Sequence, residues 1–154
     1  MTRLFPLFVL LGSASVLGAA LVSQFVGGLA PCEMCIWQRW PHAIAIALVA
    51  IGLAIKGPKA GGIYLIAGLV LLVGAGIGVF HAGVELKYWD GPGGCTGGST
   101  VGLTTAQVLE QILNAPLVRC DEIAWSFAGL SMAGWNAVCS TILAGVAFFA
   151  AQRA

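Results

Sequence analysis

The chain has 154 residues, of which 59% are hydrophobic and 8% are charged, and its mean hydropathy is +0.96. A soluble domain carries about 25% charged residues, so too few polar side chains remain here to cover a surface that faces water, and a water-soluble fold is excluded. The formal net charge is +1 and no basic run is present, so nothing indicates a nucleic-acid partner. We expect one compact domain surrounded by membrane lipid.

Four stretches without charged side chains predict an all-α membrane protein, a four-transmembrane-helix bundle. A helix needs about 20 residues to cross a hydrocarbon core of roughly 30 Å. We expect spans at residues 4–26, 36–55, 61–82 and 130–151, and outer loops at residues 27–39 and 84–129. The second uncharged stretch, Pro41–Ile55, is too short alone, so its helix must begin near Ile36 and bring Arg39 to the membrane edge.

The first segment has a rival interpretation, because a basic start followed by an apolar run also occurs in signal peptides. Its apolar core is longer than the usual ~7–15 residues of such peptides, which favours a retained helix. Cleavage would leave the rest of the topology unchanged.

The placement of charged residues predicts the orientation of the bundle. The N-terminus, the second connection and the C-terminus share one side and carry Arg3, Lys56, Lys59 and Arg153. The positive-inside rule assigns this side to the cytoplasm. All six acidic residues fall on the other side.

The outer loops hold four of the five cysteines. Cys32 and Cys35 lie in the first loop, and Cys95 and Cys120 lie in the second. Between the latter two, Thr104-x-x-Gln107 fits a capping box and is followed by an apolar stripe, which together predict a short helix. This helix either lies flat on the lipid interface or packs against other protein, and the sequence favours neither.

The Cys32-Glu33-Met34-Cys35 motif admits three interpretations. A structural disulfide would close a very small loop and constrain little. A metal site of four cysteines is possible, but thiols on this side face oxidants and no nearby histidine completes a usual zinc pattern, so we expect no metal. A redox-active pair explains the spacing directly, because one thiol attacks a disulfide and its neighbour resolves the mixed disulfide.

Two further polar residues are candidates for the same site. Arg39 follows Cys35 by four residues, about one helical turn, where a fixed cation favours the thiolate and can donate hydrogen bonds to a carbonyl oxygen. The alternative is an arginine that only reaches the lipid headgroups. His81 ends the third span and is expected beside Arg39 as a hydrogen-bond partner or proton relay, or else as an ordinary interfacial residue. Cys139, in the middle of the last span, is expected to be an inert small hydrophobe, and His42 has no assigned role.

These features together resemble the DsbB family of bacterial disulfide-bond formation membrane proteins. The resemblance rests on Cys32-x-x-Cys35-x-x-x-Arg39, the four spans, the histidine that ends the third span and the second cysteine pair. The segment from Arg119 to Trp125 is also similar to the family's region after its last catalytic cysteine. Gln38 is a departure, because some relatives have an acidic residue at this position.

The resemblance implies a thiol:quinone oxidoreductase of the bacterial inner membrane, with its active loops in the periplasm and both termini in the cytoplasm. It implies that Cys95 forms a mixed disulfide with a reduced DsbA-like thioredoxin-fold partner and that Cys120 is the pair of Cys95. Electrons then pass to the Cys32–Cys35 disulfide, and Cys35 hands them to ubiquinone or menaquinone held near Arg39.

Two other classes of protein remain alternatives. An enzyme like vitamin K epoxide reductase also has four spans and two cysteine pairs, but there the loop pair precedes the C-x-x-C motif, whereas here the motif comes first. A structural membrane protein would carry the same cysteines as passive disulfides.

Overall fold

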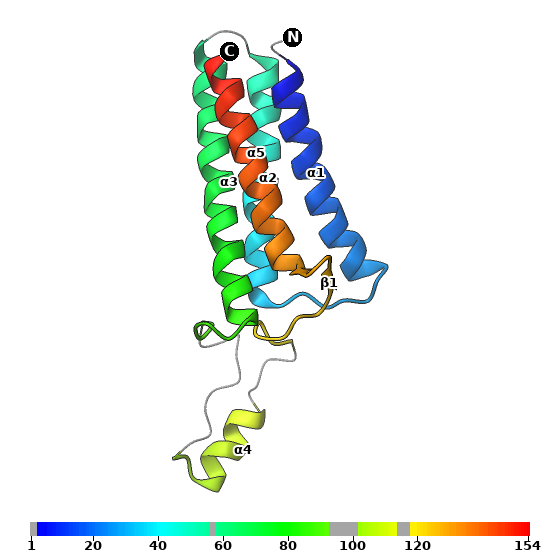
Figure 1. Cartoon of the computed structure of the whole chain (residues 1–154), viewed down its shortest axis with the longest axis vertical. Coiled ribbons are helices and arrows are strands. Elements are labelled where there is room, and N and C mark those ends of the chain that lie inside the picture. Colours follow the sequence, from blue (N-terminus) through cyan, green and yellow to red (C-terminus); the bar gives the residue numbers. More distant parts are fainter. Residues whose placement is uncertain (1–2, 56–57, 93–101, 114–117) are drawn as a thin grey trace.

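The computed structural model of the protein describes residues 3–55, 58–92, 102–113 and 118–154. Four long helices run side by side in it: α1 (Leu4–Phe25), α2 (Glu33–Ala54), α3 (Pro58–Glu85) and α5 (Met132–Gln152) (Figure 1). Each is long and apolar enough to cross a membrane. In lipid a backbone must satisfy its own hydrogen bonds, which a helix does within one segment. The predicted all-α membrane bundle is confirmed.

The start of α1 and the end of α5 lie at the same end of the bundle (Figure 1). Figure 1 shows the start of α1, the end of α2, the start of α3 and the end of α5 at one end of the bundle. The segments that carry the described loop cysteines lie at the opposite end, which we call the outer end. The helix α2 begins at Glu33, three residues before the expected start near Ile36.

The helices α2, α3 and α5 pack tightly through small residues. A Cβ atom added at Gly78 of α3 would lie 3.0 Å from the Ala133 carbonyl oxygen of α5, and one added at Gly74 would lie 2.8 Å from Pro41 Cβ of α2. In lipid no hydrophobic effect drives helices together, so their association depends on the van der Waals contacts that such close approach allows. At Gly18 of α1, by contrast, an added Cβ would meet nothing within 4 Å. The helix α1 therefore stands further from its neighbours in this region.

The short helix expected in the second outer loop is α4 (Thr105–Leu113), and it lies beyond the outer end of the bundle (Figure 1). The backbone N–H of Thr104 donates to Gln107 Oε1 at 2.9 Å, which is one half of the predicted capping box. Leu109, Ile112 and Leu113 are exposed. The position of α4 on a lipid interface stays a prediction.

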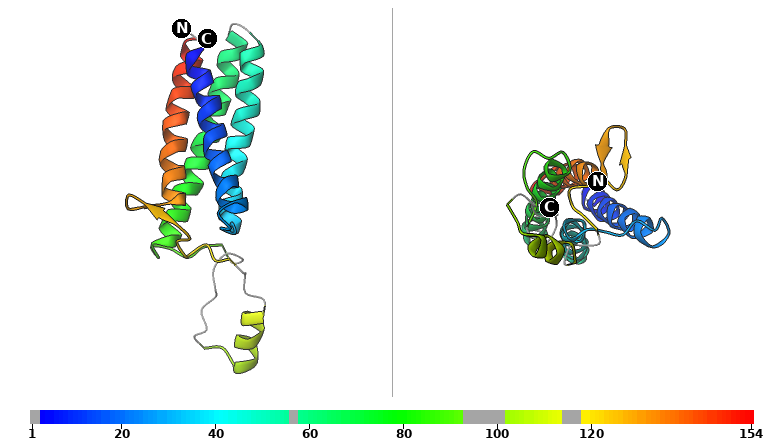
Figure 2. Two further views of the ribbon diagram at one scale, coloured as in Figure 1. Left: turned by 90° about the vertical axis from the view of Figure 1, so that its right-hand side faces the viewer. Right: turned by 90° about the horizontal axis from the view of Figure 1, so that it is seen from below.

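A small β-hairpin precedes α5 and was not expected from the sequence. Its strands β1 (Ser126–Phe127) and β2 (Leu130–Ser131) pair antiparallel and project sideways from the outer end of the bundle (Figure 2). Ala128 and Gly129 form the two-residue turn with φ of 50° and 80°, the left-handed values that a tight hairpin turn requires. Ser131 then caps α5 by accepting a hydrogen bond from the Gly134 N–H at 3.2 Å.

Candidate functional site

The C-x-x-C motif forms the N-terminus of α2. Cys32 is the N-cap residue, and its sulfur accepts a hydrogen bond from the backbone N–H of Cys35 at 3.3 Å. The two thiols are free, and the Cys32 thiol donates to the Cys35 sulfur at 2.9 Å. This spacing follows from helix geometry, because an N-cap side chain reaches the N–H group three residues later. The motif thus brings both sulfurs to a helix end that favours negative charge.

The two thiols are not equivalent. The hydrogen bond that Cys32 donates to Cys35, together with burial, raises the pKa of Cys32 well above its usual range. Cys32 therefore keeps its proton, while the hydrogen bond it donates stabilises negative charge on the Cys35 sulfur. Cys35 is the better placed of the two to act as a thiolate.

The cysteine of the second loop that the structure describes lies directly against this pair. Cys120 is disulfide-bonded and fully buried, and it packs in one cluster with Cys32, Met34 and Val84. The sulfurs of Cys32 and Cys120 and a ring nitrogen of His81 all lie within 4.8 Å of one another. Such a trio has the spacing of metal ligands, but a disulfide-bonded sulfur is not a thiolate ligand. The arrangement instead suits exchange between two cysteine pairs.

An ionic cluster holds the Cys120 segment on the end of α3. Asp121 Oδ2 lies 2.5 Å from Lys87 Nζ and 2.7 Å from Arg119 Nη2. The hydrogen bonds from Arg119 and Lys87 hold the pKa of Asp121 well below its usual range. Lys87 has a left-handed φ of 62° and closes α3 with hydrogen bonds from Lys87 N to Val84 O and from Tyr88 N to Gly83 O, a helix ending in which glycine is usual.

His81 is fixed in orientation and tautomer by Gln38. Gln38 Nε2 donates to the Met34 carbonyl oxygen at 3.2 Å and lies 2.7 Å from His81 Nδ1. Since Nε2 of an amide only donates, His81 Nδ1 must be the acceptor, and the neutral ring carries its proton on Nε2. His81 Nε2 lies 3.6 Å from Cys32 Sγ. His81 also forms a hydrogen bond with the backbone of Cys120, so the ring lies against both Cys32 and Cys120.

A buried carboxyl group completes the surroundings of His81. Glu85, one turn further along α3, has an oxygen 4.0 Å from His81 Nε2, and both side chains are buried. The Ser131 hydroxyl donates a hydrogen bond to the other Glu85 oxygen, which ties α5 to α3 at this level.

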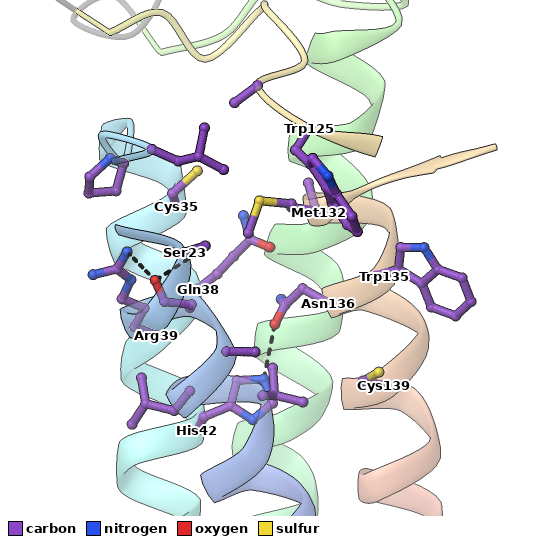
Figure 3. A pocket seen from close by; sticks show the side chains of 18 of the residues that line it. Ser23, Cys35, Gln38, Arg39, His42, Trp125, Met132, Trp135, Asn136 and Cys139 are labelled. Carbon is purple, nitrogen blue, oxygen red and sulfur yellow. Dashed lines mark hydrogen bonds between the residues drawn. The ribbon is translucent and has the colours of Figure 1, made fainter. Parts of the chain in front are cut away.

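A cavity of about 430 Å³ opens on the other side of the cysteine pair, between α1, α2, α5 and the residues just before β1 (Figure 3). Its apolar wall includes Val16, Leu17, Trp125, Phe127 and Met132. Its polar lining residues are Ser23, Gln38, Arg39, His42 and Asn136, with the thiols of Cys35 and Cys139. A largely apolar cavity with a few polar groups is the usual form of a site for a small organic ligand.

Arg39 lies in this cavity one turn from Cys35, as its spacing predicted. Its Nη1 donates to Gln24 Oε1 at 2.5 Å and its Nη2 donates to the Ala20 carbonyl oxygen at 3.4 Å, so the guanidinium faces α1. Arg39 Nε is buried, and no described residue accepts a hydrogen bond from it. A buried donor without an acceptor is expensive, which indicates a ligand here.

The structure thus brings together three of the predicted catalytic cysteines, Cys32, Cys35 and Cys120. The fourth, Cys95, lies outside the described residues. Arg39 shares the cavity with Cys35. His81 is not beside Arg39 as expected, because Arg39 turns toward α1 while the His81 ring contacts Gln38 and Cys32. A quinone-binding role for His81 stays a prediction without a contact that supports it.

Sequence reasoning missed Gln38, His42 and Asn136 as site residues. All three line the cavity. A signal was present for the latter two, because an imidazole or amide inside a lipid-spanning segment is a functional candidate by default. His42 also follows Arg39 by three residues, which places both on one face of α2.

Comparison with known proteins identifies the family of this chain. Residues 2–150 match the family model described as "Disulfide bond formation protein DsbB". The chain is 32% identical to disulfide bond formation protein B of Aromatoleum aromaticum, over 91% of this chain and 86% of that protein. It is 34% identical to the protein of that name in Polaromonas naphthalenivorans, over 88% and 82%, and 31% identical to that of Marinobacter nauticus, over 94% and 89%. No solved structure matches the chain significantly. With a match over nearly its whole length and a C-x-x-C pair at the end of a four-helix bundle able to span a membrane, the chain belongs to the DsbB family of disulfide bond formation proteins.

Proposed function

We propose that the protein is a thiol:quinone oxidoreductase that reoxidises a periplasmic DsbA-type dithiol oxidase. Electrons from the partner enter at Cys95 and Cys120, pass to Cys32 and Cys35, and leave to a membrane quinone. One observation carries the proposal: the Cys32 sulfur lies in one cluster with that of Cys120, while Cys35 lines the cavity that holds Arg39. Cys120, the Cys32–Cys35 pair and the cavity therefore lie next to one another in that order.

The distance between Cys32 and Cys120 supports an exchange between the two pairs. When the partner has reduced the loop pair, a Cys120 thiolate attacks Cys32 Sγ, the Cys32–Cys35 bond breaks, and Cys35 leaves as a thiolate. The helix N-terminus stabilises that leaving group, and His81 Nε2 lies 3.6 Å from the sulfur under attack. Closure of the loop disulfide then releases Cys32 as a thiol. Once Cys32 and Cys35 have taken up the protons that Cys120 and Cys95 lost, two electrons and two protons have moved from the partner's dithiol to Cys32 and Cys35.

The cavity fits a quinone ring. A quinone supplies an oxidant that accepts two electrons and two protons, in balance with the two thiols that become a disulfide. Arg39 offers an unpartnered buried N–H to a carbonyl oxygen, and Cys35 opens on the same space. Trp125, Phe127 and Met132 give it an apolar wall against which a ring can pack. DsbA-type oxidants have a high potential, near −120 mV, so a strong oxidant such as a respiratory quinone is needed to regenerate them.

The orientation follows from charge. Arg3, Lys59 and Arg153 gather at the end of the bundle opposite the cysteines, which the positive-inside rule assigns to the cytoplasm. The cysteine end then faces the periplasm of a bacterial inner membrane, where disulfides form and persist.

The test is steady-state turnover of the purified protein with a reduced DsbA-type protein and a soluble ubiquinone or menaquinone analogue, with quinone absorbance recorded without oxygen. We expect one quinone reduced for each partner disulfide formed, and no turnover after Cys32→Ser. Partner oxidation without quinone loss, or no oxidation at all, would contradict the proposal and favour passive disulfides.

A further inference from the structure

A buried polar cluster lies deeper in the bundle than Arg39 and takes no part in the thiol chemistry above. His42 of α2 is 1% exposed, and its Nε2 lies 3.0 Å from Asn136 Oδ1 and 3.2 Å from Ser140 Oγ, both on α5. His42 and Asn136 line the same cavity as Cys35 (Figure 3). Polar groups in a lipid-spanning bundle are costly, and those kept there usually serve a site.

The cluster leaves one hydrogen-bond donor unused. Because Asn136 Oδ1 can only accept, His42 must carry its proton on Nε2 and donate it to Asn136. The amide oxygen faces His42 and Nδ2 is turned away, while His42 Nδ1 is itself buried without a partner among the described residues. Asn136 Nδ2 is buried, and no residue in the described part of the chain accepts a hydrogen bond from it. Arg39 Nε is also buried without an acceptor, so two residues that line the cavity each have a buried donor that lacks a hydrogen-bond partner.

The two donors come from different sides of the cavity. Arg39 belongs to α2 and turns toward α1, where it contacts Gln24 and Ala20. Asn136 belongs to α5. A ligand with a single acceptor satisfies only one of them. A 1,4-quinone carries two carbonyl oxygens on opposite sides of one flat ring, and it suits both.

We infer that the cavity has a second binding end, in which Asn136 donates a hydrogen bond to the carbonyl oxygen of a 1,4-quinone that lies away from Arg39. Asn136 is thus a ligand-binding residue, and His42 is a positioning residue that holds the Asn136 amide. The inference rests on the proposed function and extends it, because it assigns a separate residue to each carbonyl.

The test is infrared difference spectroscopy of the full-length protein in lipid nanodiscs with a quinone carrying ¹³C at one carbonyl at a time. A hydrogen bond lowers the stretching frequency of the carbonyl that accepts it. In the unmodified protein we expect both carbonyl bands below those of free quinone. Asn136→Leu should return one band to the free frequency and weaken quinone binding roughly 5–10-fold, whereas Arg39→Ala should shift the other band.

The matched control is Thr141→Val, which removes a polar group from the same helix at a residue that does not line the cavity. It should leave both bands in place. If Arg39→Ala shifts one band but Asn136→Leu leaves the second unchanged, the inference is overturned while the proposed function stands. If the unmodified protein perturbs neither band and binds no quinone, the proposed function fails together with the inference.

Two substitutions separate positioning by His42 from simple packing. His42→Phe keeps a ring but loses the donor, and the Asn136-dependent band should shift toward the free value. His42→Gln restores an N–H near the former Nε2 position and should restore the band. Equal spectra for the two variants would contradict the positioning role, and an unchanged Arg39-dependent band in both shows that the bundle is folded.

Discussion

Replacing Arg39 by alanine removes the only described cation in the cavity and tests whether this residue binds quinone or only anchors the protein in lipid headgroups. The guanidinium contacts Gln24 and the Ala20 carbonyl oxygen through its two terminal nitrogens, and its Nε is buried without an acceptor. The Ala20 oxygen also accepts from the Ser23 hydroxyl at 3.0 Å, so it keeps a partner after the substitution. Only the Gln24 side chain loses its donor, and we expect a loss of about 1 kcal/mol in the free energy of unfolding.

The effect on quinone binding should be larger. A hydrogen bond to a charged group contributes about 1.5–3 kcal/mol net, which corresponds to about a 10- to 150-fold weaker interaction. Arg39→Ala should therefore raise the Michaelis constant for quinone by this factor. Arg39→Lys should give an intermediate constant, because an ammonium keeps the charge but cannot reproduce the planar set of donors.

Steady-state kinetics over a series of quinone concentrations, with all variants in one detergent, measures this constant. Lys59→Ala is the control, because it removes a cation from the first turn of α3, which begins at the opposite end of the bundle (Figure 1). Its Michaelis constant should equal that of the unmodified protein. If lysine substitutes fully for Arg39 and alanine does not move the constant, Arg39 is a headgroup anchor and the reasoning is wrong.

Three further predictions concern the cysteines. Cys95→Ser should abolish oxidation of the partner but leave the Cys32–Cys35 pair reducible by small thiols and active toward quinone; full activity on the partner would make the loop pair structural. Asp121→Asn should slow exchange between the two pairs roughly two- to fivefold at neutral pH, because exposed ion pairs are each worth about 0.2–1 kcal/mol. Because the pKa of Asp121 is depressed, the ion pairs are intact at pH values above the usual pKa range of a carboxyl group and are lost only in stronger acid. Rapid-quench trapping of thiols at pH 7 measures the rate of exchange between the pairs. An unchanged exchange rate would exclude a role for the ionic cluster. Because the Cys32 pKa is raised, Cys32 should stay protonated through the usual thiol range, and mass spectrometry of the reduced protein after brief alkylation near pH 8 should find Cys35 modified first. Equal modification would refute the asymmetry of the pair.

Much of the fold was predictable because lipid imposes strict conditions on the chain. Apolar runs of spanning length must be helices, since no other single segment satisfies its own backbone in a membrane. The start of α2 was predicted near Ile36 because the uncharged stretch Pro41–Ile55 is too short to cross a membrane and about 20 residues are needed. The helix instead begins at Glu33, because the Cys32 sulfur caps it. Its first turn can lie outside the hydrocarbon core, so the charge of Glu33 does not prevent this start. Cysteine is not among the usual capping residues, so the sequence carried no clear sign of this start.

The hairpin before α5 was not predictable from local patterns. Its turn, Ala128-Gly129, lacks the Asn-Gly or Asp-Gly pair that marks such hairpins, and its strands have two residues each. The hairpin nevertheless matters, because Phe127 and the preceding Trp125 form part of the cavity wall.

The candidate site was predictable only where its residues are neighbours in sequence. Cys35 and Arg39 are one helical turn apart, and a helix alone brings them together. The contact between His42 and Asn136 joins residues on α2 and α5, and the contact between His81 and Cys32 joins α3 to α2. Such pairs depend on how the helices pack, which the pattern of apolar residues does not specify.

The central claim is that the four loop cysteines pass two electrons to a quinone, and a single-turnover experiment without oxygen tests it most directly. The protein is prepared with Cys32 and Cys35 reduced and the second pair oxidised, the state that the described thiols and the disulfide at Cys120 represent. It is then mixed with a stoichiometric amount of quinone. We predict one quinone reduced per protein and, by mass spectrometry after alkylation, a new disulfide between Cys32 and Cys35. Loss of the free thiols without an equal amount of quinol, or quinol formed while both thiols stay free, would contradict the account.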